Sequence, residues 1–151
     1  MKSEPDVYSI DDMEKQGTGE WEGVRNYQAR NFMRDMKEGD LVLFYHSNTK
    51  PPGVVGVVKV VREAHPDETQ FDEKSPYYDA RVKKGEPRWD VVDVGHVETF
   101  AETVSLETMK DTKALDGMLI LRKGNRLSVT PVDKKHFKAV LKLAGAKTTV
   151  R

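Results

Sequence analysis

The 151-residue sequence contains no cysteine, which excludes disulfides, thiolate nucleophiles and cysteine-ligated zinc sites together. It also lacks any run of about 18 consecutive apolar residues, the length that a membrane-spanning helix needs. The polar residues 1–6 lack the apolar segment of a signal peptide. We therefore expect no membrane partner and a cytoplasmic location, with association with the nucleoid left open.

The sequence has no excess of charge of one sign either, because 25 lysines and arginines balance 25 aspartates and glutamates. A protein that holds nucleic acid mainly by neutralising phosphates is normally basic, so bulk charge is not a source of affinity here. Charge is still uneven along the chain: basic side chains gather in residues 25–34, 81–88 and 122–126, and acidic ones in residues 63–73. The basic segments are explained equally well as solvated surface and as patches that face a polyanion.

The usual sequence patterns of catalytic sites are missing as well. The four histidines are His46, His65, His96 and His136, and none lies in an HExxH or zinc-deaminase pattern. No GxSxG elbow or glycine-rich phosphate loop occurs. The sequence therefore predicts no catalytic residues, no metal ligands and no cofactor. A small hydrolase or nuclease that uses His46 with Glu4 stays open as an alternative.

Hydrophobic periodicity and turn residues predict a chain of mixed elements. Helices are expected at about residues 9–17, 26–37, 105–110 and 133–143, and strands at about residues 41–45, 54–61, 77–82 and 89–97. No repeat, linker or low-complexity tract divides residues 1–151, so we expect a single domain. Because the strands are not regularly separated by long helices, the pattern favours the α+β class, with a small curved sheet or pseudo-barrel flanked by helices.

The most informative segment is residues 21–32, WEGVRNYQARNF, which places an indole directly before a helix rich in arginine and amide side chains. A second indole, Trp89, occurs far along the chain. Either tryptophan taken alone is explained by core packing. Together with their polar neighbours, Trp21 and Trp89 predict the two walls of a pocket for a planar polar ligand such as a nucleobase. The polar residues 46–48 and 3–4 lie near strand ends, where side chains commonly line a site.

Six motifs spread over the whole chain resemble the EVE domain. They are KSEP at residues 2–5, the segment 21–32, YHSN at 45–48, YD at 78–79, PRW at 87–89 and RLSVTPV at 126–132. The resemblance implies a PUA-like fold, a mixed β pseudo-barrel of about five to six strands with helices, related to the YTH readers of methylated adenine in RNA. Family sequences usually continue upstream of the first motif with a strand like Tyr-Trp-Leu, so we expect a shortened first strand here.

The resemblance also implies a function, that of a non-catalytic reader that accepts a flipped modified base, chiefly modified cytosine in DNA such as 5-methylcytosine. The base-binding residues it implies are Trp21 and Trp89 as aromatic walls, with Ser3, Glu4, Asn26, Ser47 and Asn48 reading the base edge. The residues it implies for the nucleic-acid backbone or the pocket rim are Arg25, Gln28, His46, Arg88 and Arg126. Three further residues of the segment, Tyr27, Ala29 and Phe32, are expected in the core.

Three alternatives to a DNA reader stay open: a reader of modified RNA bases, a free-nucleoside sensor, and the small hydrolase. Family members fused to nucleases and helicases imply a functional association with such enzymes. Stacking on an aromatic wall is worth about 1–3 kcal/mol per base, and an added methyl group about as much. We therefore expect a modest preference for the modified base, roughly tenfold to a hundredfold, and a shallow salt dependence.

Overall fold

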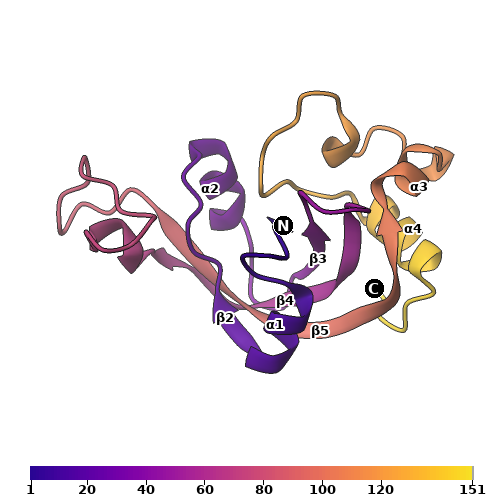
Figure 1. The fold of residues 1–151 in the computed structure, drawn as a ribbon, viewed down its shortest axis with the longest axis horizontal. Helices are drawn as coiled ribbons and strands as arrows, with labels where there is room; N and C mark the ends of the chain where they lie inside the picture. Colours follow the sequence, from indigo (N-terminus) through magenta and orange to yellow (C-terminus); the bar gives the residue numbers. More distant parts are fainter. Residues whose placement is uncertain (151) are drawn as a thin grey trace.

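A five-stranded sheet runs through the molecule and curls strongly, with helices packed against it (Figure 1). The computed structural model describes residues 1–150. Its strands are β1 (Lys2–Ser3), β2 (Thr18–Glu20), β3 (Leu41–His46), β4 (Gly53–Pro66) and β5 (Asp90–Ser105). Its α-helices are α1 (Ile10–Gln16), α2 (Tyr27–Arg34), α3 (Leu106–Lys110) and α4 (Lys134–Ala144), and short 3₁₀ turns occur at Glu68–Phe71, Lys113–Leu115 and Leu119–Leu121.

The sheet is mixed, with the strand order β1-β3-β4-β5-β2. Only β1 and β3 run parallel among these neighbours; the other pairs are antiparallel. The register between β4 and β5 shifts at several points, including Gly56, where a Cβ would lie 2.3 Å from the carbonyl oxygen of Glu98. Such bulges bend strands and increase their twist, so the two long strands can curl through the whole molecule. The α+β class and the curved mixed sheet are confirmed, and β1 and β2 form the two edges of the sheet.

The apolar run of β4 is nearly continuous because both faces of the sheet are covered. Val58 and Val60 pack into one core with Met13, Trp21 and Phe44. The alternate residues Val54 and Val57 pack into a second core with other buried side chains, among them Leu43, Phe100, Met109 and Phe137. Helices α1 and α2 supply residues to the first core, and α3 and α4 supply residues to the second. Segment 21–32 therefore lies against the first core, to which it supplies Trp21, Val24 and Ala29.

The helix ends follow from capping residues. Ser9 and Asp12 form a reciprocal capping box at the start of α1. The side chain of Asn26 accepts a hydrogen bond from the backbone N–H of Ala29 and so starts α2 at Tyr27. Helix α2 ends at Arg34, three residues earlier than expected. Among the residues described, no helix has the length and apolarity required to traverse a bilayer.

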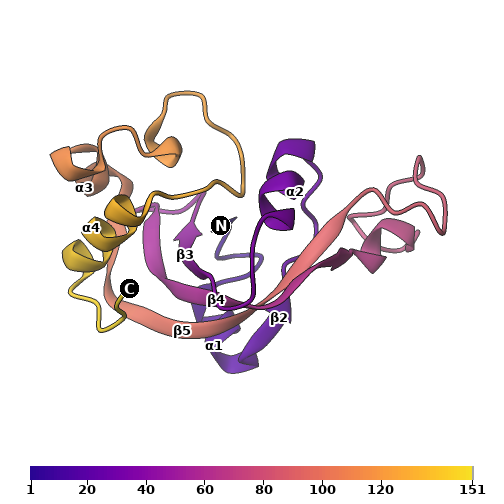
Figure 2. The ribbon, with the colours of Figure 1, turned by 180° about the vertical axis from the view of Figure 1, so that it is seen from behind.

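The expected strand at residues 77–82 is wrong. These residues belong to an arm, residues 67–89, that joins β4 to β5 and projects beyond the sheet (Figure 2). The arm is built from turns, since the backbone N–H of Val82 bonds to the carbonyl of Asp79 and that of Glu86 to the carbonyl of Lys83. The first strand is short, as expected, with two residues paired to β3.

Candidate base-binding site

A cavity of about 600 Å³ lies between β1, the segment after β2 and the arm. Its lining comes from Lys2, Ser3, Glu4, Val7 and Tyr8, from Gln16, from residues 20–24, and from Tyr77 and Ser128. Four separate parts of the chain therefore meet here. Three aromatic side chains and several hydroxyl and carboxyl groups surround one space, which is the composition of a site for a planar polar molecule.

Trp21 forms a fixed wall of this cavity. Its indole makes edge-on contacts with Phe44, at a centroid distance of 5.3 Å, and with Tyr8, at 6.5 Å. Its backbone N–H donates to the carbonyl of Val92 on β5. The residue is only 8% exposed, so the indole presents a limited part of its surface to the cavity and belongs to the core as well.

The hydroxyl proton of Ser3 is used in a hydrogen bond within the protein. Ser3 Oγ donates to the carbonyl oxygen of Tyr8 at 2.6 Å, so its oxygen is left to accept a hydrogen bond from a ligand. Burial lowers the pKa of the neighbouring Lys2, and burial together with Asp12 raises the pKa of Tyr8. The Ser3 side of the cavity thus offers an acceptor that is held in place by the backbone.

Two carboxyl groups, Glu20 and Glu22, also line the cavity. Burial, followed by the charges of Asp67 and Glu20, raises the pKa of Glu22. Such a carboxyl takes up a proton more readily than an isolated one and can then donate as well as accept a hydrogen bond. A base edge that carries both an amino donor and a ring-nitrogen acceptor matches this capacity.

The corner of the cavity at Gly23 is held by Asp67, which is fully buried. Its Oδ2 accepts from the backbone N–H of Gly23 and from Arg25, both at 3.0 Å, and its Oδ1 accepts from Thr69. Burial alone would raise the pKa of this carboxyl, but the hydrogen bonds from Thr69, Gly23 and Arg25 outweigh it and lower the pKa. The carboxylate of Asp67, which belongs to the arm, therefore links the arm to segment 21–25.

Arg25, which the sequence places at the nucleic-acid backbone or the pocket rim, is bonded to Asp67 and to other residues of the arm. Its guanidinium donates twice to the carbonyl oxygen of Tyr77, at 2.7 and 3.0 Å, and also to Asp67, Thr69 and Val24. All of these donors bond to protein groups, and the two bonds to the carbonyl of Tyr77 hold Tyr77 in place as a wall of the cavity. Its predicted place at the nucleic-acid backbone or the pocket rim stays a prediction.

Trp89 does not line the cavity, and the prediction that the two tryptophans form facing walls is wrong. Trp89 is 2% exposed, and its Nε1–H donates to Asp79 at 2.9 Å. Hydrogen bonds from Arg81 and from Trp89 hold the pKa of Asp79 well below its usual range.

Tyr27, expected in the core, is instead 50% exposed and stacks on Trp89. The core expectation holds for Ala29, which is fully buried, and Phe32 packs against the first core.

Three of the other predicted residues support the first strand rather than line the cavity. His46 Nε2 accepts from the backbone N–H of Ile10 at 3.1 Å, and burial lowers its pKa against the opposing charge of Asp11. The backbone N–H of Ser47 donates to the carbonyl of Ser3, and Asn48 Nδ2 donates to Glu4 at 3.4 Å. These contacts fix Ser3 and Glu4 at the cavity, which makes Ser47 and Asn48 positioning groups.

The remaining predicted residues lie around α2, in the arm and in the segment after the 3₁₀ turn Leu119–Leu121. The side-chain oxygen of Asn26 accepts from the backbone N–H of Ala29 and so caps α2. Gln28 is exposed on α2. Arg88 donates its backbone N–H to Gln70. Arg126 is exposed two residues before Ser128. The cavity residues that the sequence did not predict include Tyr8, Glu20, Glu22, Tyr77 and Ser128. All of these except Tyr8 lie within or directly beside the EVE-like motifs, which was the available signal.

Two other features of the molecule have some of the properties of a binding site. Ligand atoms of Glu20, His65 and Asp93 lie within 4.8 Å of one another and could hold a cation. His65 Nε2 is already 2.8 Å from Asp93 Oδ1, so a hydrogen bond explains the grouping without an ion. A larger hollow, about 770 Å³, lies between α2, β3 and α4, but it is lined mainly by apolar side chains and contains none of the predicted site residues.

These observations define a small α+β domain with an aromatic-walled cavity at the end of a curled sheet, and sequence comparison agrees. The family model of the EVE domain matches residues 1–143, and the chain belongs to this family. It is 43% identical to thymocyte nuclear protein 1 of Gallus gallus over 162 residues, which is 95% of this chain and 66% of the chicken protein. The chain thus spans about two thirds of that relative.

Two solved structures resemble the fold over nearly their full lengths. A crystal structure of a protein from Pseudomonas putida has a TM-score of 0.93 at 42% identity and covers 95% of this chain and 97% of its own. Human thymocyte nuclear protein 1, solved in complex with DNA containing 5-methylcytosine, has a TM-score of 0.91 at 40% identity and covers 98% of this chain and 97% of its own.

Proposed function

We propose that this protein is a non-catalytic reader of modified cytosine in DNA and that the 600 Å³ cavity receives the modified base. The observation that carries the proposal is the pairing of aromatic walls with fixed acceptors in one cavity. A nucleobase needs a flat apolar surface for its faces and hydrogen bonds at its edge. Support comes from the human relative, which was solved with 5-methylcytosine DNA and shares 40% of its residues with this chain.

The edge chemistry fits an amino-bearing base, which cytosine and adenine both are, and the choice of cytosine rests on the human relative. Cytosine presents an amino donor beside a ring-nitrogen acceptor, and the cavity offers Ser3 Oγ as an acceptor and Glu22 as a carboxyl whose pKa is raised by burial and by the charges of Asp67 and Glu20. A methyl group on the cytosine ring would add apolar contact with the walls, worth about 1–3 kcal/mol of discrimination. A base inside a duplex cannot reach such a cavity, so the nucleotide must be extruded at a cost of a few kcal/mol.

Chemistry on the bound base is not part of the proposal. No histidine lines the cavity among the residues that the structure describes, and His46, the base of the hydrolase alternative, accepts a backbone hydrogen bond beneath α1. A reader without its own activity would act together with a nuclease or helicase that uses the bound site.

The test is a binding screen at fixed salt with oligonucleotides of one sequence that contain cytosine, 5-methylcytosine or 5-hydroxymethylcytosine, each made as DNA and as RNA. We expect a preference of roughly tenfold to a hundredfold for a modified cytosine in DNA. The variant Ser3→Ala should weaken binding of plain and modified cytosine alike, because it removes the fixed acceptor for the base edge that both share. Equal binding of all DNA probes would refute the proposal, tighter binding of RNA would favour the RNA reader, and capture of free 5-methyldeoxycytidine alone would favour a nucleoside sensor.

A further inference from the structure

Tyr27 is an exposed aromatic side chain that the protein holds rigidly. It is the first residue of α2 and is 50% exposed. Its ring stacks on the buried indole of Trp89, with centroids 4.8 Å apart and an angle of 29° between the planes. Most exposed tyrosines move freely among rotamers, and fixing one costs conformational entropy. Here the inner face is already anchored, so the outer face is available without that cost.

The neighbouring arginine lies beside this stack. Arg30 is 4.8 Å from the Tyr27 centroid and 5.9 Å from the Trp89 centroid. A guanidinium on the outer face of Tyr27 would be much farther from Trp89 than from Tyr27, so these similar distances place it at the side. Arg30 is also held, because it donates to the carbonyl of Arg88 at 2.8 Å and to the side chain of Asn31. The outer face of Tyr27 thus stays open, with a fixed cation next to it.

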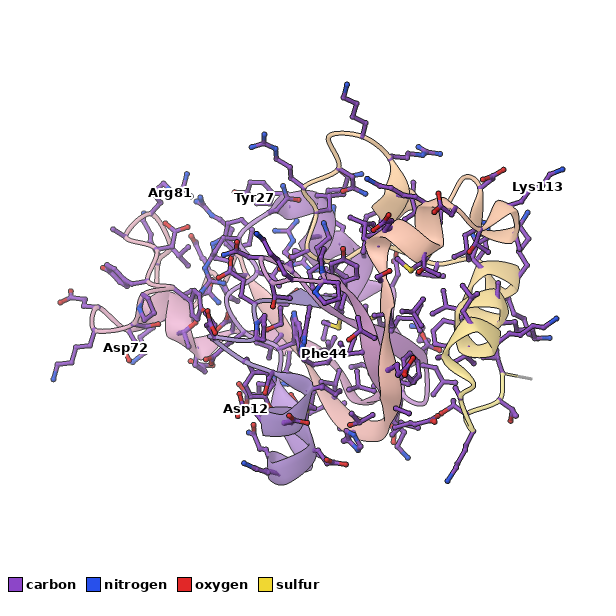
Figure 3. The ribbon with its side chains drawn as sticks, turned by 45° about the vertical axis from the view of Figure 1, so that its right-hand side comes forward. Asp12, Tyr27, Phe44, Asp72, Arg81 and Lys113 are labelled. Carbon is purple, nitrogen blue, oxygen red and sulfur yellow. The ribbon has the colours of Figure 1, made fainter. Side chains whose placement is uncertain are left out.

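The stack is linked to the proposed base cavity through rigid groups. The guanidinium of Arg25 lies 5.7 Å from the Trp89 ring and 5.8 Å from the ring of Tyr77, which lines the cavity. Tyr27 and the cavity are therefore positions on one framework, separated by the Trp89–Arg25–Tyr77 contacts. Figure 3 shows Tyr27 and Arg81, which belongs to the arm, on the arm side of the molecule.

We propose that the outer face of Tyr27 stacks on a nucleobase that flanks the extruded nucleotide, with Arg30 beside it facing the nucleic-acid backbone. The proposal rests on the function proposed above and adds a second contact to it. Extrusion of one nucleotide leaves its neighbours without a stacking partner, and a fixed aromatic face can replace that partner. Because every base has a π-face, this contact raises affinity for any sequence and does not read the modification.

The experiment compares Tyr27→Phe with Tyr27→Leu, since both keep an apolar cover over Trp89 and only phenylalanine keeps an aromatic face. The probes are DNA oligonucleotides with 5-methylcytosine or cytosine and a 2-aminopurine next to that position. We expect Tyr27→Leu to bind both probes about 5- to 100-fold more weakly than Tyr27→Phe, with the ratio between the probes unchanged. Quenching of 2-aminopurine should occur with the parent and Tyr27→Phe and should be lost with Tyr27→Leu.

Each other result has a definite meaning. Equal affinity of the two variants, or equal quenching, overturns the role of Tyr27. A loss of the preference for 5-methylcytosine in Tyr27→Leu also overturns it, because Tyr27 would then act in the base cavity. If the parent binds both probes equally but Tyr27→Leu still weakens binding, the cavity proposal fails and the stacking role stands. If the parent binds neither probe, both proposals fail.

Discussion

Arg25 and Asp67 form an ion pair, 3.0 Å between Nη1 and Oδ2, that joins the arm to the segment leading into α2. Asp67 is fully buried, and the Arg25 side chain is 22% exposed. The same carboxylate accepts the N–H of Gly23, and the same guanidinium donates to the carbonyl of Tyr77. Because Gly23 and Tyr77 both line the cavity, this pair sets the position of one of its corners.

The variant Asp67→Asn should destabilise the fold by about 2 kcal/mol at pH 7, since it removes the charge from a buried network. The carboxyl of Asp67 has a lowered pKa in the folded state, so its stabilising effect is fully present above the unfolded value of about 3.9. That effect is lost as the pH falls through the folded-state pKa. Urea unfolding at pH 7, 5 and 3 measures the change, and a gap between parent and variant that stays constant down to pH 3 would contradict it.

The variant Gly23→Ala should deform the cavity. Gly23 has a φ of +85°, and a Cβ there would lie 2.6 Å from Cε1 of Tyr77, so the tyrosine ring must move. We expect a loss of about 1–3 kcal/mol of stability and weaker binding of 5-methylcytosine DNA, measured by thermal unfolding and by titration. Gly117→Ala is the matched control, because Gly117 has a φ of +88° and no atom within 4 Å of the added Cβ. A similar loss of affinity in both variants would mean that strain, and not Tyr77, is responsible.

Most of the fold could be predicted from local signals. Ser9 and Asn26 cap α1 and α2 as their residue types indicate. The apolar run of β4 marks a strand that is covered on both faces. Residues 77–82 of the arm were expected as a strand because residues 78–82 alternate apolar and polar side chains, whereas their backbone groups bond within turns.

The site was harder to predict, because residue type does not tell which side of a core an aromatic ring faces. Trp21 lines the cavity while Trp89 is sealed by Tyr27 and by the hydrogen bond to Asp79. Both tryptophans have arginines nearby in the sequence, and only the tertiary structure separates them. The long-range contact of Arg25 with the carbonyl of Tyr77, 52 residues away, has no local signature either.

Conservative changes at the two tryptophans should therefore have different effects. Trp89→Phe removes the donor to Asp79, so we expect a loss of about 1–3 kcal/mol of stability with the preference for 5-methylcytosine retained. Trp21→Phe shrinks a cavity wall and should lower that preference, while the core contacts with Tyr8 and Phe44 are partly kept. Chemical unfolding and paired titrations with modified and plain DNA report the two quantities. A loss of preference in Trp89→Phe alone would place the base at Trp89 instead.

Salt dependence can test whether Arg126 contacts the phosphate backbone. Arg126 is exposed near the cavity residue Ser128, and each phosphate contact in B-DNA adds about 0.9 to the slope of log K against log salt concentration. We expect Arg126→Ala to reduce the slope by about one contact and to weaken binding of modified and plain DNA alike. Lys138→Ala is the control, because Lys138 is exposed on α4, which packs on the second core. If both variants change the slope equally, the attraction comes from overall charge, and Arg126 has no particular place at the backbone.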